Sequence, residues 1–140
     1  LFLTERMVGP MALMDAHVDY LPGGGAELAV EATLLAGDIT VDLTGGVGAT
    51  EKDDHNLWRL EGEAGAIRLR DWSTAEILGD DGDWRTAPDA MPHEKARPLI
   101  LRDQLTKLAD MTAGRPHDLA TVEEAYAVQE IVEGILASGV

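Results

Sequence analysis

Cysteine is absent from the 140 residues, and aromatic residues make up only 4% of them. Without cysteine the chain can form no disulfide framework, no thiolate zinc site and no cysteine nucleophile. The scarcity of aromatic side chains indicates an aliphatic core. No apolar run approaches the roughly 20 residues that span a bilayer, and Leu1–Leu3 is too short for the apolar core of a signal peptide. These absences predict a cytoplasmic protein without a membrane partner.

Basic residues are also few. The chain has 11 Lys and Arg residues against 26 Asp and Glu residues, which gives a net charge of −15 and a pI near 4.4. A surface of this charge repels phosphate backbones and anionic lipid headgroups. We therefore expect no nucleic-acid partner.

A phosphate-binding loop is missing as well. The segment 45–52 (GGVGATEK) follows a strand pattern and begins like a dinucleotide-binding fingerprint. Glu51 occupies the position of the third glycine, and Asp53 and Asp54 follow it, where they would repel phosphate. No helix is predicted after the loop to direct its N-terminus at a phosphate. The sequence therefore predicts an ordinary loop at the end of a hairpin.

Residues that could carry chemistry are scattered along the chain. Asp15, His17 and Asp19 alternate along one strand, so they share a face and form an alternative metal-ligand set. A solvated or inter-subunit strand face is the favoured interpretation, because no other ligand cluster converges there. The remaining histidines are interpreted as polar residues of loops and helix starts, with no Ser–His–Asp set: His55, His93 and His117. Three tryptophans in separate strand segments are expected to anchor a core or an interface: Trp58, Trp72 and Trp84.

Alternation of apolar and polar residues predicts a series of strands separated by glycine-containing turns. The predicted strands cover 10–21, 27–35, 39–44, 56–61, 66–70, 74–78 and 84–87. The short loops between them favour antiparallel hairpins. In the first two strands, the side chains that face away from the predicted core form a candidate dimer surface: Met11, Leu13, Asp15, His17, Ala29 and Leu35.

Two helices are predicted after the strands. The first is expected from Pro98 to about Thr112, with Leu101, Leu105 and Leu108 facing inward. The order of strands followed by helices, without alternation of the two, predicts an α+β fold. We expect residues 1–140 to form a single domain, in which a largely antiparallel, open-faced sheet has both helices on one face.

The final helix carries the strongest local signal in the chain. Thr121 and Glu124 have the spacing of a capping box, in which each side chain accepts a hydrogen bond from the backbone of the other residue. Apolar residues then recur at three- and four-residue spacing to Leu136, and Gly139 is expected to stop the helix. This apolar stripe is interpreted as a core face rather than as a helix that docks into a partner.

Three segments share features with one enzyme family. Segment 56–69 has a strand–Gly-x-x-Gly–strand pattern, 105–116 (LTKLADMTAGRP) ends on Gly-Arg-Pro, and 119–138 begins with Leu-Ala-Thr before Glu-Glu-Ala. They resemble the C-terminal domain of the Gfo/Idh/MocA family of NAD(P)-dependent oxidoreductases, with 1–10 as the end of a preceding helix. The resemblance implies a GAPDH-like open sheet whose free face mediates oligomerisation.

The resemblance also implies where the chemistry lies. Family members bind NAD or NADP in an N-terminal Rossmann domain and use a lysine of a Glu-Lys-Pro segment, and neither motif occurs in this sequence. No catalytic or cofactor-binding residue is therefore assigned here. We expect a substrate-binding and oligomerisation domain that is inactive by itself and whose parent oxidises a sugar- or polyol-like alcohol. The alternative is a stand-alone, non-enzymatic α+β module that dimerises or binds a small ligand.

Overall fold

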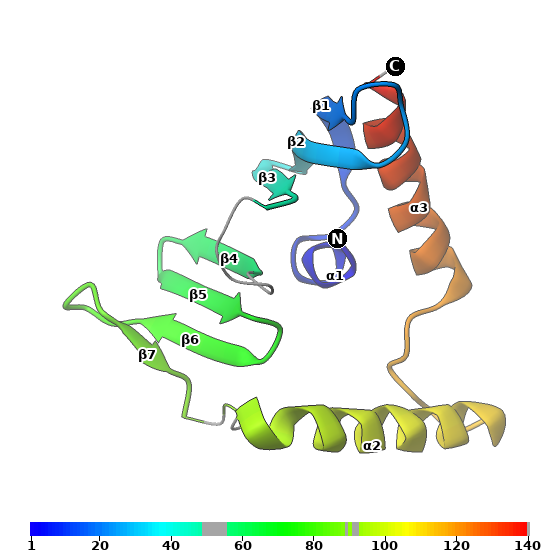
Figure 1. Ribbon diagram of the computed structural model, residues 1–140. Coiled ribbons are helices and arrows are strands. Elements are labelled where there is room, and N and C mark those ends of the chain that lie inside the picture. The colour runs from blue at the N-terminus through cyan, green and yellow to red at the C-terminus, as the bar shows by residue number, and fades with distance from the viewer. Residues whose placement is uncertain (49–55, 89, 91–92, 140) are drawn as a thin grey trace. The chain divides into compact units, whose positions relative to one another are not determined.

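The computed structural model describes residues 1–48, 56–88, 90 and 93–139 (Figure 1). Their elements are α1 (Phe2–Val8), β1 (Ala12–Tyr20), β2 (Glu27–Ala36), β3 (Ile39–Gly46), β4 (Leu57–Gly62), β5 (Gly65–Arg70), β6 (Thr74–Leu78), β7 (Trp84–Thr86), α2 (His93–Thr112) and α3 (Val122–Ala137). All strand pairs are antiparallel, so the predicted α+β class is confirmed.

The chain divides into two compact units. The first unit comprises Leu1–Ala49 with Ala120–Val140, and the second comprises Thr50–Leu119. Each has its own sheet, with strand order β1-β2-β3 in the first and β4-β5-β6-β7 in the second. Two sheets thus replace the single sheet that the sequence suggested, and the two predicted C-terminal helices belong to different units.

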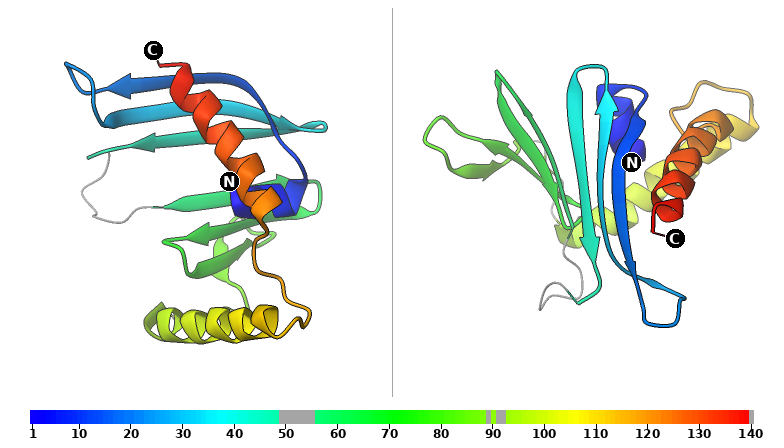
Figure 2. Two further views of the ribbon diagram at one scale, coloured as in Figure 1. Left: turned by 90° about the vertical axis from the view of Figure 1, so that its right-hand side faces the viewer. Right: turned by 90° about the horizontal axis from the view of Figure 1, so that it is seen from above.

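The core of the first unit lies between its sheet and α3. This helix crosses one face of β1–β3 (Figure 2). The buried side chains at this contact are aliphatic, as the composition predicted, and Leu34 at its centre is fully buried. The cluster consists of Val18, Ala32, Leu34, Ile131 and Ile135. Apolar residues alternate along β2 and recur at helical spacing along α3, so each element has one apolar face. These two faces pack against each other in the cluster.

The start of α3 is fixed by two interactions. The predicted capping box is present: the Glu124 N–H donates to the Thr121 hydroxyl, and the Thr121 N–H donates to the Glu124 carboxylate at 2.7 Å. Arg6 of α1 also donates two hydrogen bonds to that carboxylate, at 2.9 and 2.8 Å. The hydrogen bond from Arg6, followed by the one from the Thr121 backbone, lowers the pKa of Glu124 to about 2.

The end of α3 differs from the prediction. The helix ends at Ala137 with Ser138 as its C-cap, and Gly139 does not adopt the left-handed conformation of a glycine stop. Gly139 is instead required by close packing, because a Cβ atom there would lie 2.9 Å from the backbone oxygen of Val18. The Tyr20 hydroxyl donates to the Leu136 carbonyl at 3.0 Å, which satisfies one of the free acceptors of the last turn.

Candidate functional site

The free face of the first unit is acidic and rich in threonine. Strand register places His17 opposite Glu31, and Glu31 opposite Thr44. The same face carries four carboxylates from three strands: Asp15, Asp19, Glu31 and Asp42. Ala29 and Leu35 lie on this face, and Leu35 is 38% exposed. Four of the six residues of the candidate dimer surface are therefore together, namely Asp15, His17, Ala29 and Leu35.

Met11 and Leu13 were expected on that face, and this placement is wrong. Both side chains pack against the core cluster, and Leu13 lies against Gly134 of α3, where an added Cβ would be 3.1 Å from it. The cause is a β-bulge: Leu13 pairs with Leu34, whereas Asp15 pairs with Thr33, so Met14 is an additional residue in β1. Because of this additional residue, Met11 and Leu13, which precede the bulge, face α3 instead of the free face.

The metal-ligand alternative has no support in the geometry. The His17 Nε2 and Asp19 Oδ1 atoms lie 3.2 Å apart, but Asp15 does not complete a cluster with them. Among the described residues no group of three or more histidine or acidic side chains is arranged to hold a metal ion. Residues two apart on a strand are separated by roughly 7 Å, so consecutive pairs along one face seldom converge on a point.

One face of the second sheet holds a charged network. Glu76, with 8% of its surface exposed, accepts hydrogen bonds from Arg68 Nε at 2.7 Å and from Arg70 Nε at 3.2 Å. These hydrogen bonds lower the pKa of Glu76 below its ordinary value, and the bond from Arg68 has the largest effect. Hydrogen bonding to Glu76 in turn raises the pKa of Arg70. The network explains how a carboxylate can be buried in a small sheet, because two cations compensate for its lost hydration.

Trp84 forms the edge of this network. The guanidinium carbon of Arg68 lies 4.2 Å from the centre of the Trp84 ring, and that of Arg59 lies 5.4 Å from it. Both distances are within the range of a cation–π interaction. Arg59 also forms an exposed ion pair with Glu61. Trp84 was predicted to anchor a core or an interface, and in the structure its ring instead packs against two arginines.

The turn between β5 and β6 has an unusual backbone. Asp71 and Trp72 both have positive φ angles, 49° and 63°, and the Ser73 N–H donates to the Arg70 carbonyl at 3.2 Å. This is the geometry of a type I′ turn, in which glycine and asparagine are the usual residues. A left-handed backbone costs a bulky residue about 1 kcal/mol or more. Trp72 therefore occupies a strained turn and is 71% exposed.

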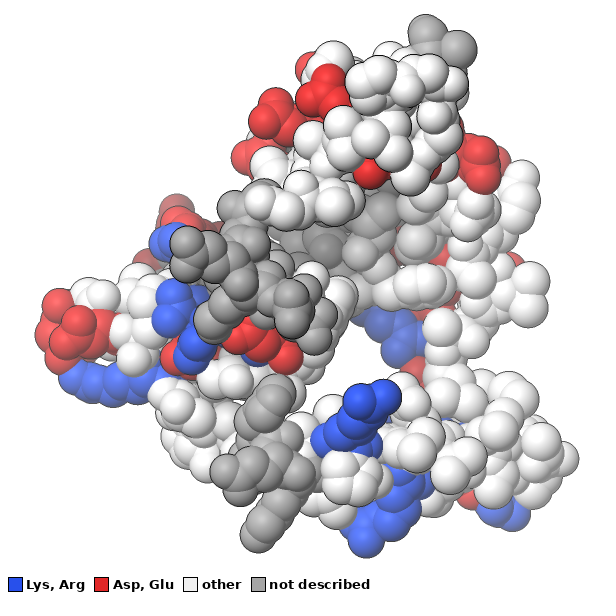
Figure 3. Space-filling model, viewed as in Figure 1, with Lys and Arg blue, Asp and Glu red and all other residues white. Residues whose placement is uncertain are grey.

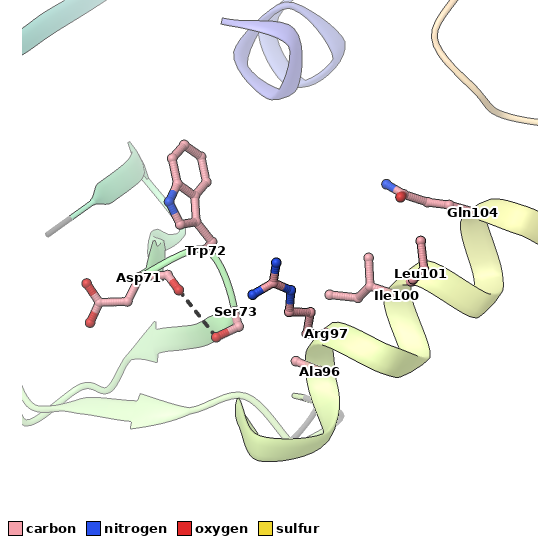
Figure 4. Close-up of a pocket in the computed structure, with 8 residues that line it drawn as sticks. All are labelled: Asp71, Trp72, Ser73, Ala96, Arg97, Ile100, Leu101 and Gln104. Atoms are coloured by element: carbon pink, nitrogen blue, oxygen red, sulfur yellow. Dashed lines mark hydrogen bonds between the residues drawn. The ribbon is translucent and has the colours of Figure 1, made fainter. Parts of the chain in front are cut away.

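A pocket of about 770 Å³ opens beside this turn within the second unit (Figure 4). Its walls are the turn on one side and the first half of α2 on the other. Figure 4 shows the guanidinium of Arg97 extending from α2 toward the turn, with the Asp71 carboxylate directed away. The lining residues are Asp71, Trp72, Ser73, Ala96, Arg97, Ile100, Leu101 and Gln104. Its volume lies within the usual range for small-molecule sites.

Sequence reasoning missed this pocket because it misjudged α2. The helix begins at His93, five residues before the predicted start, so that Ala96 and Arg97 lie on it and Pro98 lies inside it. The prediction that its leucines face inward is also wrong, since they are 43–57% exposed: Leu101, Leu105 and Leu108. One sequence feature could have pointed to the pocket: the short Asp71-Trp72-Ser73 connection between two predicted strands, which places a tryptophan in a tight turn.

Of the other residues singled out from the sequence, those that the structure describes lie outside these two sites. Residues 49–55, which include the second half of segment 45–52 and His55, lie outside the described residues, as does the side chain of His93. Gly45 and Gly46 of that segment belong to the end of β3. Trp58 is half-buried on β4, on the sheet face opposite the network, and His117 is exposed between α2 and α3. None of the described helices is both long enough and apolar enough to cross a membrane.

Comparisons with protein-family models, with curated proteins and with solved structures find no match to this chain. The resemblance to the Gfo/Idh/MocA family therefore stays a prediction. The free sheet face of the first unit and the pocket of the second unit are the two candidate functional sites.

Proposed function

We propose that this chain is the substrate-binding and oligomerisation domain of an NAD(P)-dependent oxidoreductase of the Gfo/Idh/MocA type. One observation carries the proposal: in the first unit an antiparallel sheet is covered by α3 on one face and open on the other. A sheet with a free face is suited to pairing with a second copy. NAD or NADP would bind to a separate Rossmann domain, which would also supply the catalytic lysine.

The acidic residues of the free face should make self-association depend on salt concentration. Two copies that meet through it bring two sets of the same four carboxylates together, and these charges repel each other. Leu35 and Ala29 supply the apolar contact in the middle strand. Added salt screens exposed charges, and the distance over which they still interact falls from about 10 Å at 0.1 M to about 3 Å at 1 M. The proposed dimer should therefore be stronger at high salt.

Sedimentation equilibrium tests this expectation. Raising NaCl from about 0.05 to about 0.5 M should tighten the dimer several-fold, because screening weakens the repulsion between carboxylates. Leu35→Glu should abolish the dimer, since it replaces an apolar side chain of the face with a further negative charge. Val122→Glu is the matched control, because Val122 is 80% exposed at the start of α3, off the sheet. A monomer at all salt concentrations, or equal effects of both variants, would contradict the oligomerisation role.

The pocket of the second unit favours the alternative of a small-ligand-binding module that works alone. Its volume and its combination of apolar and polar side chains are those of a ligand site. The two functions differ in whether a dinucleotide-binding domain precedes this chain in the same polypeptide.

A further inference from the structure

The pocket beside Trp72 combines an aromatic surface, an aliphatic wall and one cation. Trp72 presents its indole from the turn, and Ile100 and Leu101 present aliphatic side chains from α2, with 42% and 55% of their surfaces exposed. Arg97 extends between these two walls (Figure 4). An aromatic ring and a guanidinium in one pocket suit a ligand that has a flat apolar part joined to an anion.

The charged residues that line the pocket are Arg97 and Asp71, and the Asp71 carboxylate is directed away from Arg97 (Figure 4). No acidic side chain of the described residues lies within ion-pair distance of Arg97, whereas the Asp71 carboxylate lies 4.0 Å from Arg70 Nη1. Of the 11 Lys and Arg residues, Arg6 alone belongs to the first unit. Figure 3 shows much of the blue surface over α2 and the second sheet. The one cation that lines the pocket is thus available for a ligand carboxylate.

The backbone of the turn supplies an independent argument. Trp72 is bulky, exposed and held in a left-handed conformation that glycine or asparagine would adopt at lower cost. It gains little from burial where it stands, so the fold alone gives no reason for a tryptophan at this position. Strain of this kind is found where a side chain must be presented to a ligand.

We propose that this pocket binds an aryl carboxylate, with the ring stacked on Trp72 and against Ile100, and with the carboxylate paired to Arg97. The Gln104 amide, which lines the same wall, provides a further donor for the carboxylate. This inference uses only the second unit and does not depend on the proposed oxidoreductase function.

Isothermal titration calorimetry with 2-naphthoate tests the site in the full chain. We expect saturable binding with a Kd on the order of 0.1 mM, typical of a ligand of this size. Acetate carries the charge without the ring, and 2-naphthalenemethanol carries the ring without the charge. Each should bind at least about tenfold more weakly than 2-naphthoate, because each loses one of the two contacts.

Two variants separate the contacts. Arg97→Gln should weaken 2-naphthoate binding at least about tenfold and leave 2-naphthalenemethanol binding unchanged. Trp72→Gly should abolish binding of both while raising Tm by a few degrees, since glycine relieves the left-handed strain. Arg102→Gln is the matched control, because Arg102 lies on α2 and does not line the pocket.

The proposal is overturned if 2-naphthoate shows no saturable binding up to several times the expected Kd. It is also overturned if Arg97→Gln and Arg102→Gln have equal effects, or if the uncharged alcohol binds as tightly as the carboxylate. If Trp72→Gly raises Tm but still binds 2-naphthoate fully, the heat of binding measured by calorimetry comes from another site, and this result would contradict the proposal.

Discussion

Replacing Leu34 with alanine is expected to lower the free energy of unfolding of the first unit by about 3 kcal/mol. Leu34 is fully buried at the centre of the cluster between the sheet and α3. It lies on β2, which pairs with β1 on one side and β3 on the other, so the backbone cannot move in to fill the cavity. Hydrogen exchange of peptides from β1–β3 and α3 measures this loss.

Leu35→Ala is the matched control, because Leu35 is the next residue of the same strand but faces away from α3. Its exposed fraction is 38%, and truncation there should cost less than about 1 kcal/mol. Equal losses for the two variants would mean that the sheet is not covered on one face, and the argument for a free face would fail with it.

Replacing Glu76 with glutamine is expected to destabilise the second unit by about 3 kcal/mol. The change removes the one carboxylate shared by Arg68 and Arg70 and leaves two guanidinium groups close together without their common anion. All three tryptophans belong to the second unit, so their fluorescence during urea unfolding reports this loss. Glu61→Gln is the control, since the Arg59–Glu61 pair is exposed and should contribute less than about 1 kcal/mol.

The same carboxylate gives the second unit a defined pH dependence. The pKa of Glu76 is lower in the folded protein than its ordinary value of 4.5, so the folded state favours the charged form. Its contribution to stability is complete above pH 4.5 and is lost as the pH falls through the folded pKa. Urea unfolding of the wild type and of Glu76→Gln at pH 7 and pH 3 should therefore differ less at the lower pH. A constant difference would show that the charge of Glu76 does not stabilise the sheet.

Local signals predicted the elements that depend on neighbouring residues. The capping box at Thr121 and Glu124 is present because both partners lie within one turn of a helix. The hairpins between β1 and β3 are present because the alternating pattern is interrupted by Pro22-Gly23-Gly24-Gly25 and by Gly37. At these positions sequence spacing determines structure directly.

The missed features depend on register or on irregular backbone. Met14 is apolar, so the pattern of β1 continues through the bulge and gives no sign that the face changes there. The Arg68–Glu76 pair arises from the pairing of β5 with β6, which composition does not specify. Pro98 suggested a helix start, but it lies inside α2, where its missing N–H removes one backbone hydrogen bond.

Binding of NADH and NADPH by two polypeptides tests the central claim most directly. One is this chain, and the other extends it with the coding sequence upstream of Leu1. The account predicts saturable nicotinamide fluorescence changes with the longer polypeptide and none with residues 1–140. Saturable binding by residues 1–140, no binding by the longer polypeptide, or an initiator Met directly before Leu1 would contradict it.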